Sequence, residues 1–456
     1  MSKQNEPKSC WDHFSARQLK EMQKITDRYI KFLSACKTER ETVSWVMADA
    51  KKHGFSEDFS KNTIIRQFRG KTVLLARKGR RPLCEGLRLL GAHADTPRLD
   101  LKQHPLYEDC EVGLAKTHYY GGIRKYQWLA RPLALHGVAV KNNGKQINIC
   151  IGESENDPVF AIADLLPHLA SKQASQKLSD AFDAEKLNLA LGHAPAAKDK
   201  KDADKADKRI KKQVLDLLHE RYKIEEKDLY SAELQAVPAG SARPVGLDGS
   251  LIGGYGQDDR ACVFAGLEAL YRASQPEYTQ ILIFWDKEEI GSDGATGAQS
   301  RFFEYTLEDI LDAWEPKTKF RHVMAVTKAV SADVHAPIDP DYQDLHDKLN
   351  SSLLGYGPVF CKFTGHRGKY SASEADAEYV AWFRGILDAQ KIPWQMAELG
   401  KVDIGGGGTV AKHLAVYGMN IIDFGPGVLS MHSPFELTSR ADIYASVLAY
   451  EAFFNN

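Results

Sequence analysis

The chain is poor in the features that mark secreted, disulfide-rich and membrane proteins. Its seven cysteines are scattered, odd in number and free of Cys-x-x-Cys spacing, which argues against a disulfide framework and against a thiolate zinc site. No apolar run reaches the roughly 18 residues of a membrane-spanning helix. The amino-terminal stretch has no apolar core of signal-peptide length. We therefore expect a reducing, cytoplasmic setting and no membrane partner.

An excess of charge of one sign is also missing. The chain has 60 Lys and Arg against 61 Asp and Glu, a formal net charge of -1, so the overall balance favours neither a nucleic-acid nor a membrane partner. One mixed-sign charge run covers residues 198–212. Aspartates interleave in it and no aromatic residue accompanies it, which favours a solvated loop entering a helix over a basic contact patch. We expect no nucleic-acid partner.

Several motifs of covalent and phosphate chemistry are absent. There is no Gly-x-Ser-x-Gly elbow, no Gly-Lys-Ser/Thr loop and no Gly-x-Gly-x-x-Gly fingerprint, which disfavours a serine nucleophile and a nucleotide site. The glycine cluster 404–409, with Gly406 near its centre, precedes a helical pattern. We interpret it as a flexible loop or as backbone close to a substrate.

The length and the periodicity of the chain favour an α/β protein with an insert. Its 456 residues allow two or three ordinary domains, or one large α/β domain with an insertion. Apolar spacing predicts helices and short buried strands in alternation. The predicted helices cover 15 to about 50, with a second from 42 to 52, a helix from Asp258 or Asp259, and 373–383 with Ser373 as its cap. The predicted strands are 72–77, 87–91, 280–285, 357–363 and, as the last one, 419–424.

A region of different character separates two parts of this pattern. Residues 133–140 and 146–150 alternate in polarity on either side of an Asn-Asn-Gly turn, which is typical of a β-hairpin. We therefore predict a catalytic domain in two parts, residues 1–98 and 247–456, interrupted by a strand-rich module at 99–246.

Acidic clusters mark the centre of the chain. GQDDR and DKEEIGSDGATG lie on either side of an apolar helix and the strand 280–285, whose carboxyl end is followed by Asp286, Glu288 and Glu289. In open α/β sheets chemistry gathers at the carboxyl ends of strands. An isolated DKEE would be interpreted as a solvated loop. Crowded carboxylates repel one another, however, and divalent cations relieve that repulsion.

Other acids and histidines follow predicted strands. His93 follows the strand 87–91, and Asp95 stands two residues later, the arrangement in which an acid holds the second ring nitrogen of a metal-bound imidazole. Asp333 and His335 end an apolar segment, and His432 comes just after the strand 419–424. Each of these signals is weak when taken alone.

Together these residues predict a two-metal hydrolase. Two histidines and three carboxylates can bind two cations, with one carboxylate bridging and a fourth left as a base. Nitrogen and oxygen ligands without thiolate suit zinc, manganese or cobalt better than calcium. Two such ions, roughly 3.5–4 Å apart, lower the pKa of the water between them toward about 7. The expected set is His93, Asp258, Glu288, Glu289, Asp333 and His432.

Five ordered motifs carry a family resemblance. AHADTPR, GQDDR, EEIGS, SADVHA and MHSPFE, with a long insert between the first two, resemble the aspartyl aminopeptidase family of dizinc exopeptidases. The likeness extends from about residue 15 to 454. It implies a three-layer α/β/α catalytic domain interrupted by a β-rich dimerisation domain, and dimers that assemble into a closed dodecamer. It also implies a peptide substrate.

The resemblance assigns roles position by position. It implies that Glu288 is the general base and that Asp95 orients His93. Asp258 would bridge two divalent ions, most simply zinc, although the neighbouring Asp259 is an alternative because many members have Asp-Asn here. The implied metal ligands are His93, Asp258, Glu289, Asp333 and His432.

The substrate side departs from the family pattern. A histidine that eukaryotic members have after an IPxLA-type segment is replaced here by Lys172. Lys362 is the nearest candidate for the basic residue that selects acidic amino-terminal residues, displaced by about one position. With His335 and Gly406 it forms the expected substrate-binding set. Because Lys362 is displaced, the sequence leaves open both a preference for Asp or Glu and a broader one.

Two alternatives stay open beside a metalloaminopeptidase. A carboxypeptidase or deacylase shares the dizinc fold; it would need an arginine clamp for a substrate carboxylate, and no clear one is visible. A non-catalytic assembly or cargo protein would have lost the base or the ligands, and all of them are present here.

Overall fold

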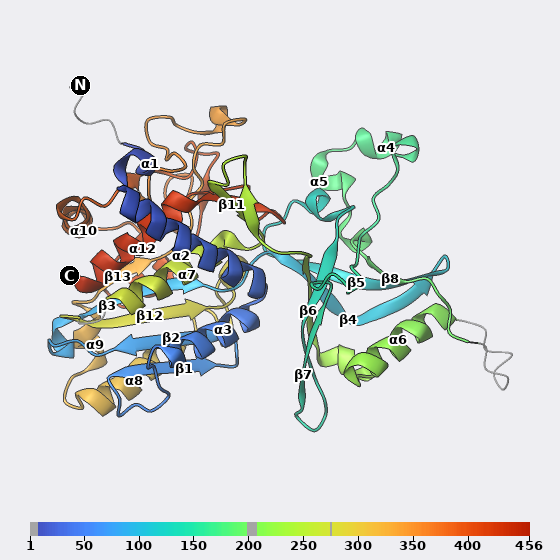
Figure 1. Ribbon diagram of the computed structural model, residues 1–456, viewed down its shortest axis with the longest axis horizontal. Helices are drawn as coiled ribbons and strands as arrows, with labels where there is room; N and C mark the ends of the chain where they lie inside the picture. The colour runs from blue at the N-terminus through green and yellow to red at the C-terminus, as the bar shows by residue number, and fades with distance from the viewer. Residues whose placement is uncertain (1–7, 198–207, 274–275) are drawn as a thin grey trace. The chain divides into compact units, whose positions relative to one another are not determined.

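The computed structural model describes residues 8–197, 208–273 and 276–456, which form two compact units (Figure 1). The α/β unit consists of the chain up to Thr96, Ala242–Met431 and Phe435–Asn456. The inserted unit consists of Pro97–Ser241 and His432–Pro434.

An eight-stranded mixed sheet forms the middle of the α/β unit. Its four central strands, β12, β3, β13 and β18, are parallel to one another, whereas β2 and β14 on either side of them are antiparallel to their central neighbours. The carboxyl ends of the four central strands therefore meet at one edge of the sheet. In spatial order the strands are β1 (Thr63–Phe68), β2 (Thr72–Arg77), β12 (Thr279–Trp285), β3 (Leu87–His93), β13 (Lys328–Ser331), β18 (Asn420–Gly425), β14 (Val359–Cys361) and β16 (Gln395–Met396).

Helices cover both faces of this sheet (Figure 1). Along β12, Leu282 and Phe284 join one hydrophobic core, while Ile281 and Ile283 join the other, which is why a strand buried on both faces appears as a continuous apolar run. The α/β class with three layers is thus confirmed. The first core includes α1 (Cys10–His13), α2 (Ala16–Ala35), α3 (Glu39–Lys52), α7 (Gln257–Arg272), α10 (Ala377–Ala389) and α12 (Arg440–Asn455), and the second α8 (Phe302–Trp314), α9 (Phe320–Met324) and α11 (Ala411–Ala415).

The inserted unit is rich in strands, as expected. Six antiparallel strands form its sheet, and β6 and β7 make the hairpin predicted around the Asn-Asn-Gly turn. The charge run 198–212 lies mainly outside the described residues, and its end belongs to α6 (Arg209–Tyr222). The sheet order is β7 (Gln146–Ile151), β6 (Leu133–Val140), β9 (Glu233–Pro238), β4 (Arg98–Asp109), β5 (Val112–Tyr120) and β8 (Leu189–Gly192), and two short helices are α4 (Ser171–Ala174) and α5 (Leu178–Ala181).

Two small sheets complete the α/β unit, and one of them corrects a prediction. The strand β18 is not the last one, because β19 and β20 follow it. β20 pairs with β11, which lies far earlier in the chain, and such long-range pairing leaves no local periodicity. The four-stranded sheet is β10 (Arg243–Val245), β11 (Leu251–Gly254), β20 (Glu436–Ser439) and β19 (Val428–Leu429), and the two-stranded one is β15 (Gly365–His366) with β17 (Gly406–Gly407).

The predicted helix at 373–383 begins later than expected. The structure starts α10 at Ala377, with Asp376 rather than Ser373 at the cap position. Glu374 is engaged in other contacts: it forms a β-bridge with Phe363 and an ion pair with Lys369. These contacts hold the chain in an extended conformation up to the helix.

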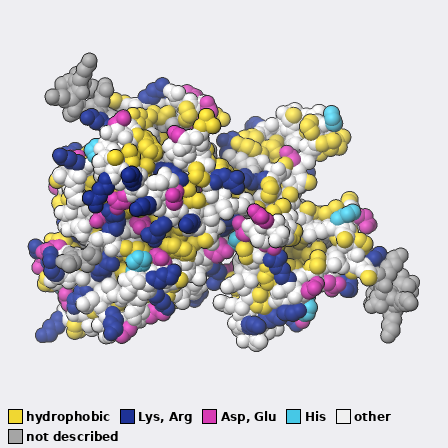
Figure 2. All heavy atoms as spheres, in the orientation of Figure 1, with side chains coloured by type: hydrophobic (Ala, Val, Ile, Leu, Met, Phe, Trp, Pro, Cys, Tyr) yellow, Lys and Arg dark blue, Asp and Glu magenta, His cyan; other side chains and the backbone are white. Residues whose placement is uncertain are grey.

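The surface and the helix lengths agree with the composition. On the face drawn in Figure 2, positive and negative side chains are interspersed. Across residues 8–197, 208–273 and 276–456, no helix combines the length and the apolar character that crossing a membrane requires.

Candidate metal centre

Polar residues collect at the carboxyl edge of the central sheet. In the parallel register, His93 at the end of β3 is opposite Trp285 at the end of β12, and Gly91 is opposite Ser331 at the end of β13. The residues that follow these strands are therefore brought to one edge. Strand ends that are separated by some 190 residues in sequence thus become neighbours in the fold.

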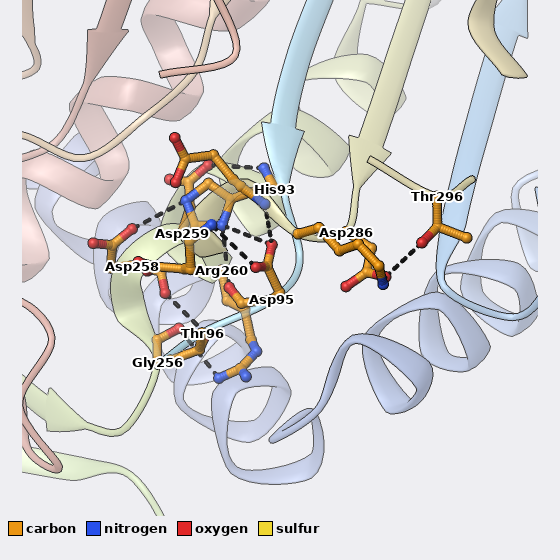
Figure 3. A network of polar contacts seen from close by, with 12 residues as sticks. His93, Asp95, Thr96, Gly256, Asp258, Asp259, Arg260, Asp286 and Thr296 are labelled. Atoms are coloured by element: carbon orange, nitrogen blue, oxygen red, sulfur yellow. Dashed lines mark hydrogen bonds and ion pairs between the residues drawn. The ribbon is translucent and has the colours of Figure 1, made fainter. Parts of the chain in front are cut away.

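His93 is held by an acid on each side (Figure 3). Its Nε2 lies 3.2 Å from Asp258 Oδ1, and its Nδ1 lies 3.1 Å from the Asp95 carbonyl oxygen and 3.4 Å from Asp95 Oδ1. A carbonyl oxygen can only accept, so Nδ1 carries a proton in either charge state, and Nε2 has a free lone pair once the ring is neutral. His93 is buried. An imidazole oriented in this way is prepared to bind a cation through Nε2.

The two aspartates at the start of α7 have different tasks. Both depart from helical backbone angles, with ψ of 106° at Asp258 and 26° at Asp259. The Asp258 carboxylate faces the His93 ring, while Asp259 Oδ2 accepts a hydrogen bond from the backbone N–H of His93 at 3.2 Å. Asp259 therefore supports the β3 end, and Asp258 is the one whose carboxylate meets the imidazole.

The loop after β12 carries Glu288 and Glu289, and Asp95 holds both of them. Lys287 has a φ of 71°, which turns the chain into a single 3₁₀ turn, Glu288–Ile290. Asp95 Oδ1 then accepts from the N–H of Glu288 at 3.1 Å, and Oδ2 from the N–H of Glu289 at 3.2 Å. The carboxylate of Asp95, which is fully buried, thus fixes two residues of the acidic loop as well as lying beside His93.

The resulting cluster suits a divalent cation. Ligand atoms of His93, Asp258 and Asp333 all lie within 4.8 Å of one another, and so do those of Asp258 and Glu289. Burial raises the pKa of Asp333 well above its ordinary value, and the carboxylates of Asp259 and Asp258 raise it further, although His93 lowers it. A cation would relieve this repulsion. Imidazole and carboxylate donors without thiolate fit zinc, manganese or cobalt.

His432 belongs to the inserted unit. Its φ is 65°, and its Nδ1 lies 3.0 Å from the carbonyl oxygen of Gly122. Because that oxygen accepts, Nδ1 is the protonated nitrogen and Nε2 keeps the lone pair that a metal would bind. His432 and His93 therefore share one tautomer, set in each case by a backbone carbonyl.

The residues expected on the substrate side are spread over the α/β unit. His335 is buried, its Nδ1 lies 3.3 Å from Ser352 Oγ, and burial lowers its pKa to about 4. Lys362 follows β14, and its carbonyl oxygen accepts from the N–H of Ala375. Gly406 pairs with His366 in the two-stranded ribbon. Among the described residues, no hydrogen bond or ion pair links these three to the ligand cluster.

Sequence reasoning missed two supporting residues. Thr96 Oγ1 donates to the Asp258 carbonyl oxygen at 3.0 Å, and the carboxylate of Glu436 accepts from the Asp258 N–H at 3.3 Å. Both residues stand inside motifs that were already noted, AHADTPR and MHSPFE. Their position within those motifs was the signal that could have found them.

Comparisons with known proteins find relatives over almost the whole chain. Residues 32–454 match the family model "Aminopeptidase I zinc metalloprotease (M18)". A protein of Clostridium acetobutylicum named Probable M18 family aminopeptidase 1 is 46% identical over 99% of this chain and 98% of its own. The crystal structure of an M18-family aminopeptidase from Thermotoga maritima has a TM-score of 0.93 at 44% identity, covering 99% of this chain and 100% of that one. The S. cerevisiae mApe1 dodecamer structure has a TM-score of 0.75 at 20% identity, covering 95% and 97%, which shows a shared fold.

Proposed function

Because the chain belongs to the aminopeptidase I zinc metalloprotease (M18) family, we propose that it removes the amino-terminal residue of peptides at a two-metal centre. The resemblance to the aspartyl aminopeptidases is confirmed at the level of this family, and the chain is an aminopeptidase and a metal-dependent hydrolase. One observation supports the proposed centre most directly: the ligand atoms of His93, Asp258 and Asp333 lie within 4.8 Å of one another at the sheet edge.

We assign two metal ions to this centre. Asp258 would help to hold both ions, because its carboxylate faces His93 and is grouped both with Asp333 and with Glu289. Bound zinc would act as a Lewis acid, polarising the scissile carbonyl and lowering the pKa of a water molecule. Manganese or cobalt would fit the same donors. The proposed ligands are His93, Asp258, Glu289, Asp333 and His432.

Glu288 is the proposed general base. Its carboxylate takes a proton from the attacking water and passes it to the nitrogen of the leaving peptide, so that the C–N bond breaks and an amine departs. Asp95 supports this step, since it receives the N–H groups of Glu288 and Glu289 and lies beside His93 Nδ1. Because the backbone of Glu288 is held in place, the distance from its carboxylate to the attacking water would vary little.

We place the amino-terminal side chain of the substrate near Lys362, His335 and Gly406. A lysine in a partly buried position would favour Asp or Glu there through an ion pair. His335, whose pKa of about 4 keeps it neutral at pH 7, would offer hydrogen bonds without adding charge. The comparisons favour an aminopeptidase over a carboxypeptidase, a deacylase or a cargo protein.

The assembly is proposed from the relatives. The S. cerevisiae mApe1 structure is a dodecamer. Exposed apolar residues lie near the short helices of the inserted unit: Leu169, just before α4, is 67% exposed, and Leu178 on α5 is 52% exposed. We propose that this chain forms homo-oligomers, with dimers assembling into a dodecamer. Its cytoplasmic setting also stays a prediction.

The test is hydrolysis of a panel of free amino-terminal X-peptides. The protein is stripped with a chelator, reloaded with zinc, manganese or cobalt, and compared with Glu288→Gln. Exposed Glu308 on α8 provides the matched control, Glu308→Gln. We expect metal-dependent release of the first residue. Loss of the base in Glu288→Gln should slow it by about 10²–10⁴-fold while metal stays bound, with no change in Glu308→Gln.

The outcomes separate the parts of the proposal. A metal-loaded wild type that leaves every free amino-terminal peptide intact would contradict the aminopeptidase function, and blocked or carboxyl-terminal substrates would then be tested. Full activity in Glu288→Gln would contradict the assignment of Glu288 as general base and leave the aminopeptidase function standing. The ranking of X decides between acidic and broad preference, and Lys362→Met checks whether this lysine sets it.

A further inference from the structure

A fully buried carboxylate stands at the start of α7. Glu436, the first residue of β20, is 0% exposed, and its Oε2 accepts from the backbone N–H of Gln257 at 2.5 Å and from that of Asp258 at 3.3 Å. The first N–H groups of a helix have no partner within the helix, and the positive end of the helix dipole lies there. These donors offset part of the cost of burying the Glu436 charge. The carboxylate is thus bonded to the backbone of the proposed bridging ligand.

The other side of Asp258 is held as well. Thr96 Oγ1 donates to the Asp258 carbonyl oxygen at 3.0 Å (Figure 3). Asp258 departs from helical backbone angles, so regular intrahelical geometry does not set its orientation. Its N–H and its C=O are fixed instead by two side chains from distant parts of the chain, Thr96 and Glu436.

A second layer fixes Glu436 itself. The Gln257 side chain donates through Nε2 to the carbonyl oxygens of Glu436 at 2.7 Å and Ile252 at 3.1 Å, and its Oε1 accepts from Tyr29 Oη at 3.1 Å. Gln257 and Tyr29 are both fully buried. The start of β20 and the start of α7 are therefore joined in one rigid polar network.

From this geometry we propose that Glu436 and Thr96 are positioning residues for the metal centre. They hold the Asp258 backbone so that its carboxylate faces His93 Nε2, at the observed 3.2 Å. Neither residue binds metal; both act through Asp258. The inference rests on the proposed function, because it takes Asp258 to be a metal ligand. Outer partners of this kind typically change metal affinity or activity by about 10–100-fold when they are replaced.

The test measures metal binding rather than activity alone. The zinc dissociation constant is obtained by competition with a chelator, and the visible absorption spectrum of the cobalt-loaded protein reports the ligand geometry. Glu436→Gln should weaken zinc binding by about 10–100-fold and alter the cobalt spectrum. Thr96→Val, which removes the hydroxyl at constant shape, should weaken it by roughly tenfold, and Thr96→Ser, which keeps the hydroxyl, should restore it.

Asp442 offers a matched control for stability. It is also fully buried, and it accepts from the N–H groups of Gly355 and Gly357, each at 2.7 Å, without contacting Asp258. Asp442→Asn should lower the unfolding temperature of the metal-free protein about as much as Glu436→Gln does. It should leave zinc affinity and the cobalt spectrum as in the wild type.

Two outcomes would overturn the proposal. Wild-type zinc affinity and an unchanged cobalt spectrum in both Glu436→Gln and Thr96→Val would overturn it, and so would an equal loss in Asp442→Asn. If Glu436→Gln does not fold, the contrast between Thr96→Val and Thr96→Ser decides. A wild-type protein that binds neither metal would overturn the proposed metal centre itself, which is a different failure.

Discussion

Two buried histidines follow neighbouring parallel strands and have opposite chemistry. His93 ends β3, and His335 follows β13. Burial lowers the pKa of His93, but the protonated ring donates hydrogen bonds to Asp258 and Asp95, and these raise the pKa well above the ordinary value on balance. Burial also lowers the pKa of His335, and no carboxylate in the described part of the chain is bonded to that ring, so the pKa falls to about 4. The neighbouring acids, rather than the place at a strand end, decide what a buried histidine can do.

The difference assigns the two rings different tasks. His93 presents Nε2 to a carboxylate, which is the setting of a metal ligand. His335 presents a neutral ring whose Nδ1 lies near the Ser352 hydroxyl, and its buried Nε2 has no hydrogen-bond partner among the described residues. A buried ring nitrogen without a hydrogen-bond partner is suited to form a hydrogen bond with a polar group of the substrate.

The largest expected effect comes from making the same replacement at both histidines. His93→Gln should lose tight metal binding and reduce kcat/KM by about 10³-fold or more. Without this ligand the metal is lost, and with it the stabilisation of the charge that develops in the transition state. His335→Gln should keep metal and reduce kcat/KM by about tenfold, the size of one hydrogen bond. Metal content and peptide hydrolysis are measured together. Metal loss in both variants, or in neither, would contradict the proposal that His93 binds metal and His335 does not.

The sequence predicted the elements that have strong local patterns. The strands 72–77 and 133–140 were predicted to the residue, and the helix preceding the strand 279–285 was placed correctly. Acids and histidines after apolar runs were assigned to one sheet edge, because parallel strands bring their carboxyl ends together. Strand β1 was missed.

The supporting contacts could not be predicted. The bond from Thr96 to Asp258 and the one from Glu436 to the same residue join positions more than 160 apart in sequence, and no periodicity encodes such pairs. For the same reason β20, which depends on β11, was not foreseen. Asp258 and Asp259 could not be separated either, since only the turn at the start of α7 directs one carboxylate to His93 and the other to the His93 backbone.

The two histidines should also give opposite pH dependences of stability in the metal-free protein. The raised pKa of His93 means that its stabilisation is complete below its unfolded pKa of about 6.5 and is lost as pH rises through the folded value. The lowered pKa of His335 means that its contribution is present above about 6.5 and is lost as pH falls toward 4, by at most about 3 kcal/mol.

Urea midpoints of chelator-treated protein between pH 4 and pH 9 test this contrast. His335→Gln should flatten the loss of stability on the acid side, and His93→Gln should flatten the loss on the alkaline side. Changes of the same sign in both variants would show that the two rings do not differ in the way their surroundings indicate.

Asp95→Asn, with a smaller expected effect, examines what makes the two histidines different. The carboxylate of Asp95 receives the N–H groups of Glu288 and Glu289 and lies 3.4 Å from His93 Nδ1. An amide in its place has one oxygen to accept with, so one of the two N–H groups loses its partner, and the charge that favours a proton on Nδ1 disappears. Metal affinity and kcat/KM should each fall by about 10–100-fold.

Asp293→Asn is the matched control for this replacement, because Asp293 is exposed on the same loop. It should leave both quantities unchanged. The pKa of His93 in metal-free Asp95→Asn, followed by NMR titration of the ring protons, should move down toward that of His335, because one of the four acids that raise it has been neutralised. A His93 titration that does not move would mean that the other acids, with Asp258 first among them, set the difference between the two histidines. Asp95 would then serve only the loop of Glu288 and Glu289.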